Sequence, residues 1–480
     1  YSIIWDGILC DGELVMPFNS TYVNRSNLLH AQLLWASDDR FVVLSQIYSI
    51  WAGDTFKKYN AYIFDRTESN PNAGKTILTA GYVTTVSDYM PEYVAEAISV
   101  FNQSNDNYFV KSVGYEFKTD EHEGDTSDFY QFYKGKSSQV ANIAIDISCG
   151  EGPDILFDSF SFAQLNSEQY LYDLSDILNE IDVEIFNNVI EASRTDGKLY
   201  QMPLSFCMDG IFAQRWMVKG EAGFTFDEYV EYVDKTCNGT NPIPVDRKTF
   251  FDICLSSMSD EFFDEEGNVS FQNDAFYELA QYCLSNVPEE IVYVEPTVGD
   301  VIDWDNVIYS YTSLYSIDTY LHLLAYGKSS VGYYGVPSLD GRGPSIGVEG
   351  SIAISAAACD YDGAKEFLKV FFSSDSNRIF KEALCNPIVV SASDMISKQN
   401  VDLNNKNYDS DLEWNTEAEL AKMHIVRFDY DVIDDYNKLI RNASTIGLMD
   451  PVIQLIVMEE IPAYFAGQKP IEDVAAIIED

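Results

Sequence analysis

The stretch Gly152-Pro153-Asp154-Ile155-Leu156-Phe157 joins a turn to a short apolar run. Before it, Val140, Ile143 and Ile147 recur at the spacing of one helix face. Gly150 then ends that pattern, as glycine often does after the last turn of a helix. A helix followed at once by a short apolar strand is typical of sheets that are covered by helices. The stretch therefore predicts a buried strand in an α/β protein.

The same alternation is found upstream. Thr76–Val83 has the composition of a strand, and a loop at Thr84–Met90 separates it from a helix opened by Pro91. Phe109–Phe117 is the next predicted strand. Because strands and helices alternate, we expect a mostly parallel sheet covered by helices.

Downstream signals continue this pattern. Asp196-Gly197 predicts a tight turn before a strand at Lys198–Pro203. Thr225-Phe226-Asp227-Glu228 is a capping box, in which the first and last side chains bond free amides at a helix start. Ala364–Phe371 has one apolar helical face, and Pro470 opens a final helix. The α/β region is thus expected to run to the end of the chain.

The first 75 residues differ from the rest. Short β-type runs at Phe41–Leu44 and Tyr59–Phe64 alternate with polar turns, and no helix is predicted. These runs resemble strands of a propeller blade. One blade cannot close a ring, so the segment is either the remnant of a larger upstream β-domain or a small β appendage.

The charge balance excludes several classes of partner. The chain has 480 residues, with 30 basic and 77 acidic side chains and a formal net charge of −47. Such a surface repels phosphate backbones, so we expect no nucleic-acid partner. Anionic membranes and anionic solutes are disfavoured for the same reason. No apolar run approaches the roughly 18 residues that a membrane-spanning helix requires.

Motifs for catalysis and for metal binding are missing. The eight cysteines form no C-x-x-C pair, and the four histidines are far apart, so no metal site and no cofactor are expected. Gly343-Pro344-Ser345-Ile346-Gly347 matches the nucleophile-elbow pattern, but a turn precedes it and a strand follows. Three Gly-Lys-Ser/Thr segments lack the first glycine of a phosphate-binding loop. The sequence does not predict an enzyme.

Aromatic side chains are abundant, with 32 Tyr, 29 Phe and 6 Trp. Sugars present apolar C–H faces that are ringed by hydroxyls, and aromatic rings beside carboxylate or amide acceptors match this surface. The composition is therefore suited to a carbohydrate ligand, although most of these rings must lie in the core.

From residue 76 onward, the order of motifs resembles the family 1 extracellular solute-binding proteins of ABC importers, the relatives of the maltodextrin receptor. Gly152–Leu156 is similar to the G-x-PDI strand of the family, and Gly197–Pro203 to its GKLYGLP strand. Thr225–Glu228 stands where the family has T-W-D-E, and Gly335–Pro337 is similar to the start of its second hinge strand. Gln201 departs from the pattern, because glycine is usual there.

The resemblance implies a two-lobed α/β fold of the type II periplasmic-binding-protein class, with strands that cross between the lobes. The first 75 residues lie outside it. We expect one lobe from residues 76–205 with 350–425 and a second lobe from residues 206–349 with 426–480.

By position in the family pattern, the solute-binding residues are expected in the loop after the first strand, past the PDI strand, at the first hinge, in the segment before the second hinge and at the second crossing. They are Thr84, Thr85, Asp88, Asp158, Phe160, Phe206, Asp209, Tyr311, Tyr315 and Glu349.

The resemblance further implies a bacterial receptor that closes on a solute and catalyses nothing. We expect a small-molecule solute, foremost a carbohydrate, an ABC permease in the membrane as partner, and a monomer in solution. An extracellular location with anchoring to the cell surface is expected, although neither signal nor anchor is present in the sequence.

Three alternatives remain open at the level of sequence. The cleft of a receptor of this type also suits a peptide or another polar solute. The β segment is compatible with an adhesion or scaffold protein at the cell surface. A glycoside hydrolase that uses two carboxylates is a third reading, because 77 acidic residues place many carboxylates near one another.

Overall fold

The computed structural model describes most of the chain. The described residues are 2–4, 7–10, 13–17, 21, 32–37, 39–51, 54–84, 90–116, 129–216, 218–220, 222–236, 243, 245–263, 268–290, 310–327, 331–447 and 450–479.

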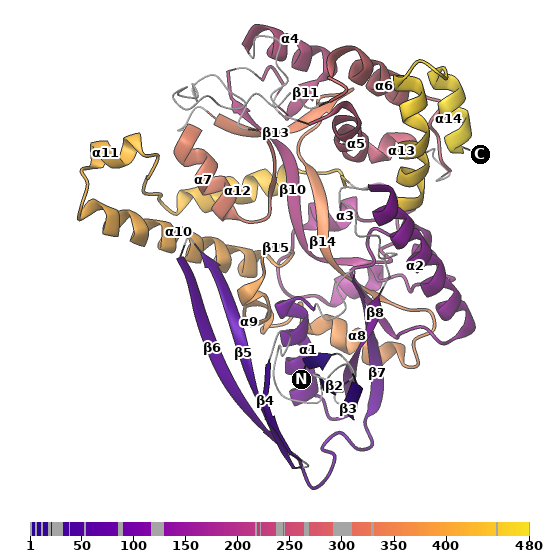
Figure 1. Cartoon of the computed structure of the whole chain (residues 1–480), viewed down its shortest axis with the longest axis vertical. Helices are drawn as coiled ribbons and strands as arrows, with labels where there is room; N and C mark the ends of the chain where they lie inside the picture. Colours follow the sequence, from indigo (N-terminus) through magenta and orange to yellow (C-terminus); the bar gives the residue numbers. More distant parts are fainter. Residues whose placement is uncertain are drawn as a thin grey trace.

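One mixed sheet organises the α/β part. Its strands follow the order β11-β13-β10-β14-β9-β7-β8, and β12 and β15 also pair with β10 (Figure 1). Their bounds are β7 Thr76–Thr84, β8 Tyr108–Glu116, β9 Ile155–Phe157, β10 Met202–Gln214, β11 Gly223–Thr225, β12 Ser310–Leu314, β13 Val331–Ser338, β14 Ser345–Ile354 and β15 Asn386–Pro387.

The middle of this sheet is antiparallel. β7 pairs in parallel with β8 and β9, and β11 with β13, but β10 and β14 are antiparallel to each of their partners. The chain leaves one end of the molecule along β10 and returns along β14, so the two strands must point in opposite directions. The expectation of a mostly parallel sheet is therefore wrong for these crossing strands.

A third segment passes beside the crossing strands. The amide of Ile346 in β14 donates to the carbonyl of Thr445 at 2.8 Å, and the amide of Gly447 donates to the carbonyl of Ile346 at 2.9 Å. Residues 443–447 follow α12 on this path. In the described part of the chain, three stretches of backbone therefore run between the two ends of the molecule.

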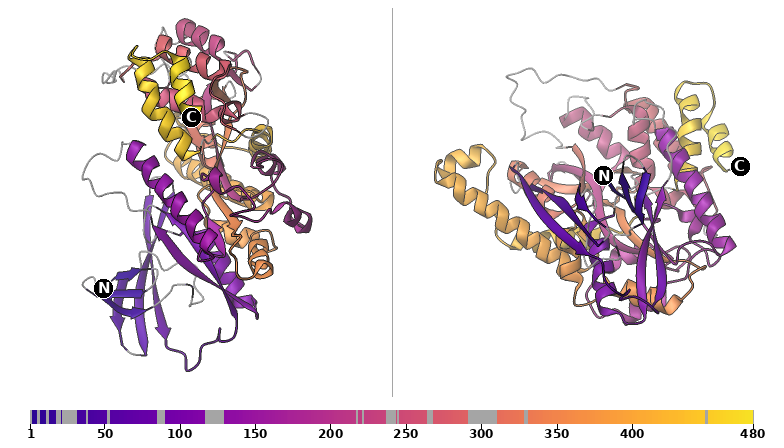
Figure 2. Two further views of the ribbon diagram at one scale, coloured as in Figure 1. Left: turned by 90° about the vertical axis from the view of Figure 1, so that its right-hand side faces the viewer. Right: turned by 60° about the horizontal axis from the view of Figure 1, so that its bottom comes forward.

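The helices cover both ends of the sheet (Figures 1 and 2). Their bounds are α1 Glu92–Ser104, α2 Phe129–Cys149, α3 Asn187–Ala192, α4 Phe226–Thr236, α5 Arg247–Ser257, α6 Asp274–Asn286, α7 Ile317–Gly327, α8 Tyr361–Val370, α9 Ser376–Ile379, α10 Val390–Leu412, α11 Glu417–Lys422, α12 Asp431–Asn442, α13 Pro451–Phe465 and α14 Ile471–Glu479.

Two large hydrophobic cores define two lobes. The first core lies around β7, α1 and α8, where Leu78, Val94 and Phe367 are fully buried. It continues along β10 as far as Phe212 and takes in α12. The second core lies under α4, α5, α6, α13 and α14, and Phe250 is buried at its centre. The predicted two-lobed α/β fold with hinge crossings is thereby confirmed.

Several local structures that the sequence predicts are present in the structure. The Glu228 carboxylate accepts from the Thr225 amide at 3.0 Å, and the Thr225 hydroxyl accepts from the Glu228 amide at 3.3 Å. Asp196 and Gly197 both have positive φ, as a tight two-residue turn requires. The strand predicted at Lys198–Pro203 is wrong at its start, because residues 198–201 follow an irregular path and β10 begins only at Met202.

In the part of the N-terminal region that the structure describes, the residues form two small antiparallel sheets that are not paired to the central one. The first has the order β1-β2-β3 (Ser2–Ile4, Gly7–Cys10, Glu13–Pro17), and the second has the order β4-β5-β6 (Gln32–Ala36, Arg40–Trp51, Asp54–Asp65). The two strands predicted in this region lie within β5 and β6. Phe41 and Phe64 stack across these strands with ring centroids 4.8 Å apart. The predicted β-rich segment is present.

A buried amide ties four elements together below the crossing. Asn386 of β15 donates from Nδ2 to the carbonyls of Phe206 at 3.2 Å and Leu314 at 3.0 Å. Its Oδ1 accepts from the hydroxyl of Tyr436 in α12 at 2.9 Å. Every hydrogen-bonding position that this amide needs inside the core is thus filled by β10, β12 and α12.

We predict that Tyr436→Phe lowers the free energy of unfolding by about 1–2 kcal/mol, because it leaves the Asn386 carbonyl buried without a donor. Urea unfolding followed by circular dichroism measures this loss. Tyr430→Phe is the matched control, since the exposed Tyr430 hydroxyl also donates to a single side-chain oxygen, on Asp402. An equal loss in both variants would contradict the structural role of the buried amide.

Candidate functional site

The crossing strands bring polar side chains from distant parts of the chain to one face. Cys207 of β10 pairs with Gly347 of β14, and Asp209 pairs with Ser313 of β12. Glu349 of β14 reaches the same group from the other crossing strand. We call Cys207, Asp209, Ser313 and Glu349 the crossing cluster.

Short contacts connect its members. The Ser313 hydroxyl donates to Asp209 Oδ1 at 2.5 Å. The Cys207 thiol lies 3.3 Å from Glu349 Oε1, a donor–acceptor distance suited to sulfur, and 4.0 Å from each carboxylate oxygen of Asp209. The thiol therefore sits between two carboxylates that come from different strands.

Gly347 allows this convergence. A Cβ at this position would lie 2.7 Å from Cys207 Sγ, 3.1 Å from Asp209 Oδ2 and 3.9 Å from Glu349 Oε1. Side chains do not tolerate contacts as short as the first of these. The absence of a side chain at Gly347 is thus what lets three polar groups meet over the backbone of β14.

Burial and like charge set the protonation of the cluster. Burial raises the pKa of Asp209, the charge of Glu349 raises it further, and the hydrogen bond from Ser313 opposes both. Burial, followed by the charges of Asp209 and Glu349, raises the pKa of the Cys207 thiol well above its ordinary value. Cys207 is therefore a protonated donor and not a nucleophile.

The charges that act on Asp209 come from acidic groups alone. Glu349 is the charged residue that shifts its pKa, and the acidic groups Asp209, Glu349 and Cys385 are those that act on Cys207. Burial and the same carboxylates also raise the pKa of Tyr315. The crossing cluster has two carboxylates, and among the described residues no basic side chain offsets them in these shifts.

Two predicted tyrosines flank the cluster. Tyr311 of β12 pairs with Ile211 of β10 and packs against the second core, and its pKa is raised by burial and then by Asp209. Tyr315 follows the end of β12, and its side chain is 44% exposed. Tyr315 therefore presents an accessible ring beside the carboxylates, whereas the ring of Tyr311 is largely packed against the second core.

Asp158 and Phe160 follow β9 near the other end of the site. The Asp158 amide donates to the carbonyl of Ser351 at 3.1 Å, and its Oδ1 accepts from the Ser351 amide at 3.2 Å. Burial, followed by the charges of Glu349 and Asp158, raises the pKa of the Cys385 thiol to about 12. Phe160 is half-buried in the turn that follows Asp158.

The remaining candidates lie elsewhere. Phe206 is fully buried in the first core, where it packs edge-on against Phe186 with ring centroids 5.7 Å apart. Its ring is on the opposite side of β10 from the crossing cluster. Thr84 is the last residue of β7, but its side chain lies outside the described part, as do Thr85 and Asp88.

Sequence reasoning missed three members of the site. Cys207 had a signal, because it stands two residues before Asp209 and alternate residues of a strand share a face. Ser313 and Cys385 had none. They reach the site through the pairing of β12 and β15 with β10, which no local pattern predicts.

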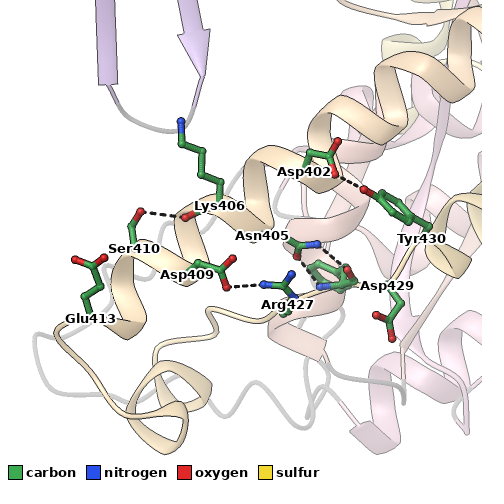
Figure 3. Close-up of a pocket in the computed structure, with 10 residues that line it drawn as sticks. Asp402, Asn405, Lys406, Asp409, Ser410, Glu413, Arg427, Asp429 and Tyr430 are labelled. Carbon is green, nitrogen blue, oxygen red and sulfur yellow. Dashed lines mark hydrogen bonds and ion pairs between the residues drawn. The ribbon is translucent and has the colours of Figure 1, made fainter.

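A separate groove of about 450 Å³ lies along α10 (Figure 3). Its polar groups bond largely to one another. Arg427 pairs with Asp409, the Tyr430 hydroxyl donates to Asp402, and the Asn405 amide donates to the Phe428 carbonyl at 2.9 Å. The side chains of Lys406, Glu413 and Asp429 also line the groove.

Neither a metal site nor a nucleophile elbow is found in the described ranges. No three of their His, Cys, Asp and Glu side chains are grouped closely enough to hold a metal ion. Ser345 is the buried first residue of β14, so a strand follows it where a nucleophile elbow needs a helix.

The known proteins that are similar to this chain are only distantly similar to it. No protein-family model and no curated protein matches the sequence. Among solved structures, a cyclic α-maltosyl-1,6-maltose binding protein from Arthrobacter globiformis is 15% identical, with a TM-score of 0.45, over 85% of this chain and 97% of its own.

Two other solved structures are similar to the same degree. An ABC substrate-binding protein from Listeria monocytogenes in complex with cycloalternan is 13% identical, with a TM-score of 0.47, over 85% of this chain and 97% of its own. A periplasmic oligogalacturonide binding protein from Yersinia enterocolitica is 13% identical, with a TM-score of 0.49, over 84% and 96%. With TM-scores below 0.5 and identities this low, we derive neither ligand nor partner from them.

We predict that Asp209→Asn removes part of the loss of stability that the protein suffers as pH rises. The folded pKa of Asp209 is raised, so its ionisation between about pH 3.9, the ordinary aspartate value, and the folded pKa lowers the free energy of unfolding. Ser313→Ala should steepen the same loss, because its hydroxyl stabilises the ionised carboxylate. Thermal unfolding from pH 3.5 to 8 tests both; identical pH profiles for wild type and Asp209→Asn would refute the assignment.

Proposed function

We propose that this chain is a binding receptor that closes its two lobes over a polar solute held at the crossing cluster, and that the solute is a sugar or oligosaccharide. The observation that carries the proposal is the position of the cluster. Its carboxylates and hydroxyl come from β10, β12 and β14, where the chain passes between the two cores.

The chemistry of the cluster suits a polyhydroxylated ligand. Asp209 and Glu349 offer carboxylate oxygens that accept hydrogen bonds from sugar hydroxyls. The Ser313 hydroxyl, which donates to Asp209, is able to donate to a ligand oxygen instead. The accessible ring of Tyr315 lies beside them and presents a flat face to apolar C–H groups. A ring platform next to several acceptors is an arrangement that binds sugars by stacking and by hydrogen bonding together.

The connections between the lobes suit closure by rotation. The stretches on which such a rotation would bend are β10, β14 and residues 443–447. On one side the lobes also touch, since Gln164 Nε2 donates to Asp450 Oδ1 at 3.1 Å at the start of α13. A solute that contacts both lobes favours the closed arrangement by its differential affinity, and closure is the signal that a membrane partner reads.

We propose the lobe boundaries as residues 76–205 with 350–425 and 206–349 with 426–480; within the second set, α7 and α12 pack on the first core. The solute-contacting residues that we propose are Asp158, Phe160, Asp209, Tyr311, Tyr315 and Glu349, together with Thr84, Thr85 and Asp88, and Phe206 as support behind the site.

The proposed setting is the outside of a bacterial cell. We propose that an ABC permease receives the solute, that the receptor acts as a monomer anchored at the surface, and that it catalyses no reaction. The order of motifs from residue 76 supports this setting. Among the described helices, none is both long enough and apolar enough to cross a lipid bilayer.

A second candidate function draws on the β segment. Trp35, Val42 and Ile63 lie side by side across β4, β5 and β6, and Trp35 and Ile63 are 52% and 62% exposed. Such an apolar strip suits a protein partner, as an adhesion or scaffold role would require. The solute screen below separates the two functions.

We predict that maltotriose or another neutral oligosaccharide raises the thermal midpoint of the purified chain, because a ligand of the folded state stabilises it by mass action. Tyr315→Ala should weaken that binding about tenfold or more through loss of the stacking ring. Trp414→Ala is the matched control, since that ring is 86% exposed at the end of α10, away from the crossing.

Isothermal titration calorimetry of both variants measures the change. No stabilisation by any mono- or oligosaccharide, peptide or amine would refute the receptor function and favour the β segment as the working surface. Equal losses in the Tyr315 and Trp414 variants would refute the location of the site.

A further inference from the structure

We infer that the solute of the crossing cluster carries a positively charged amino group, which binds between Asp209 and Glu349. This inference rests on the proposed receptor function and adds to it the charge of the ligand. Its starting point is an excess of hydrogen-bond acceptors and of negative charge at the cluster, which a neutral sugar does not offset.

The acceptors at the site outnumber the donors. Asp209 accepts one short hydrogen bond from Ser313, and Glu349 accepts one from the Cys207 thiol. Two ionised carboxylates provide about eight lone-pair positions. An ammonium group supplies three N–H donors together with a unit of positive charge, whereas a sugar hydroxyl supplies one donor and no charge.

The two carboxylates repel each other across the thiol. Asp209 is mostly buried, and Glu349 acts on it as a like charge. A buried carboxylate is costly unless an opposite charge pairs with it. Burial raises the pKa values of Asp209 and Cys207, and the charged groups that raise them further are acidic, so a cation that binds here relieves both desolvation and repulsion.

A buried hydroxyl on the same strand face is a second polar group that lacks a partner among the described residues. Ile352 and Ile354 of β14 pack in the first core, so Glu349 and Ser351 face the other side of the strand. Ser351 is fully buried, and its hydroxyl has no hydrogen-bond partner in the described part of the chain. A buried hydroxyl of this kind is expected to form a hydrogen bond to a polar ligand that also contacts Glu349.

The whole chain reinforces the preference. A formal net charge of −47 produces a negative potential that attracts cations and repels anions before contact. This long-range effect raises the association rate of any cation, but it does not select the crossing cluster. Selection at the site comes from Asp209 and Glu349.

An ammonium group has two common sources among small solutes. An amino sugar combines it with hydroxyls and with a C–H face for Tyr315, whereas a polyamine offers the charge alone. The shared chemistry is a primary ammonium, and the two sources are separate arms of the test.

The test is isothermal titration calorimetry of the full chain at pH 7 with four probes: the glucosamine trimer, the N-acetylglucosamine trimer, maltotriose and spermidine. We expect the glucosamine trimer to bind about tenfold or more tightly than the two neutral trisaccharides, since charge pairing adds to the same stacking. Tighter binding of spermidine than of the neutral trisaccharides would identify a polyamine as the source of the ammonium.

The double variant Asp209→Asn, Glu349→Gln is expected to abolish the preference while neutral binding changes less. The matched control, Asp429→Asn with Glu413→Gln, removes the same two charges from the groove along α10 and should keep the preference.

The inference fails if the neutral trisaccharides bind as tightly as the amines, and the receptor function then stands. It also fails if the amine preference survives in the double variant, because the preference then reflects net charge alone. If no probe binds, the receptor function fails and the inference fails with it.

Discussion

The antiparallel pairing of β10 with β14 is the constraint on which the rest of the structure depends. The pairing runs from Met202 opposite Ile352 to Asp209 opposite Ser345, so one ladder of hydrogen bonds spans the boundary between the two cores. Both strands contribute buried apolar side chains to the first core on one face. The opposite face is therefore the place where polar groups of both crossings meet, and the crossing cluster forms there.

The crossing cluster lowers the stability of the fold, as polar groups that are kept for ligand binding commonly do. Burial of Asp209 and of the Cys207 thiol beside the exposed Glu349 carboxylate raises the pKa values of Asp209 and Cys207, and the hydrogen bond from Ser313 opposes the shift at Asp209. Gly347 is needed for the groups to approach one another at all. By contrast, the amide of Asn386 has all its partners within the protein and fixes the strands. The crossing cluster combines the mostly buried Asp209 with the exposed Glu349, and we propose that a ligand binds there.

The sequence was informative where the signals were local and failed where contacts are long-range. Ile155–Phe157 and the capping box at Thr225–Glu228 were predicted from neighbouring residues, and the structure confirms both. The start of β10 was misjudged, because the turn at Asp196-Gly197 leads into irregular backbone before the strand begins. Ser313 is placed only by strand pairing, and no pattern in its own segment indicates Asp209 as its partner. The ligand-contacting role of the proposed side chains stays a prediction.

The most direct test of a solute site at the crossing is hydrogen–deuterium exchange of the whole chain, with and without a saturating concentration of the trisaccharide that binds most tightly. The account predicts slower amide exchange in three segments, Ser205–Asp209, Ser313–Tyr315 and Gly347–Ser351, because ligand contacts and lobe closure both protect these strands. Protection confined to the α10 groove or to β4, β5 and β6, with the crossing strands unchanged, would contradict it.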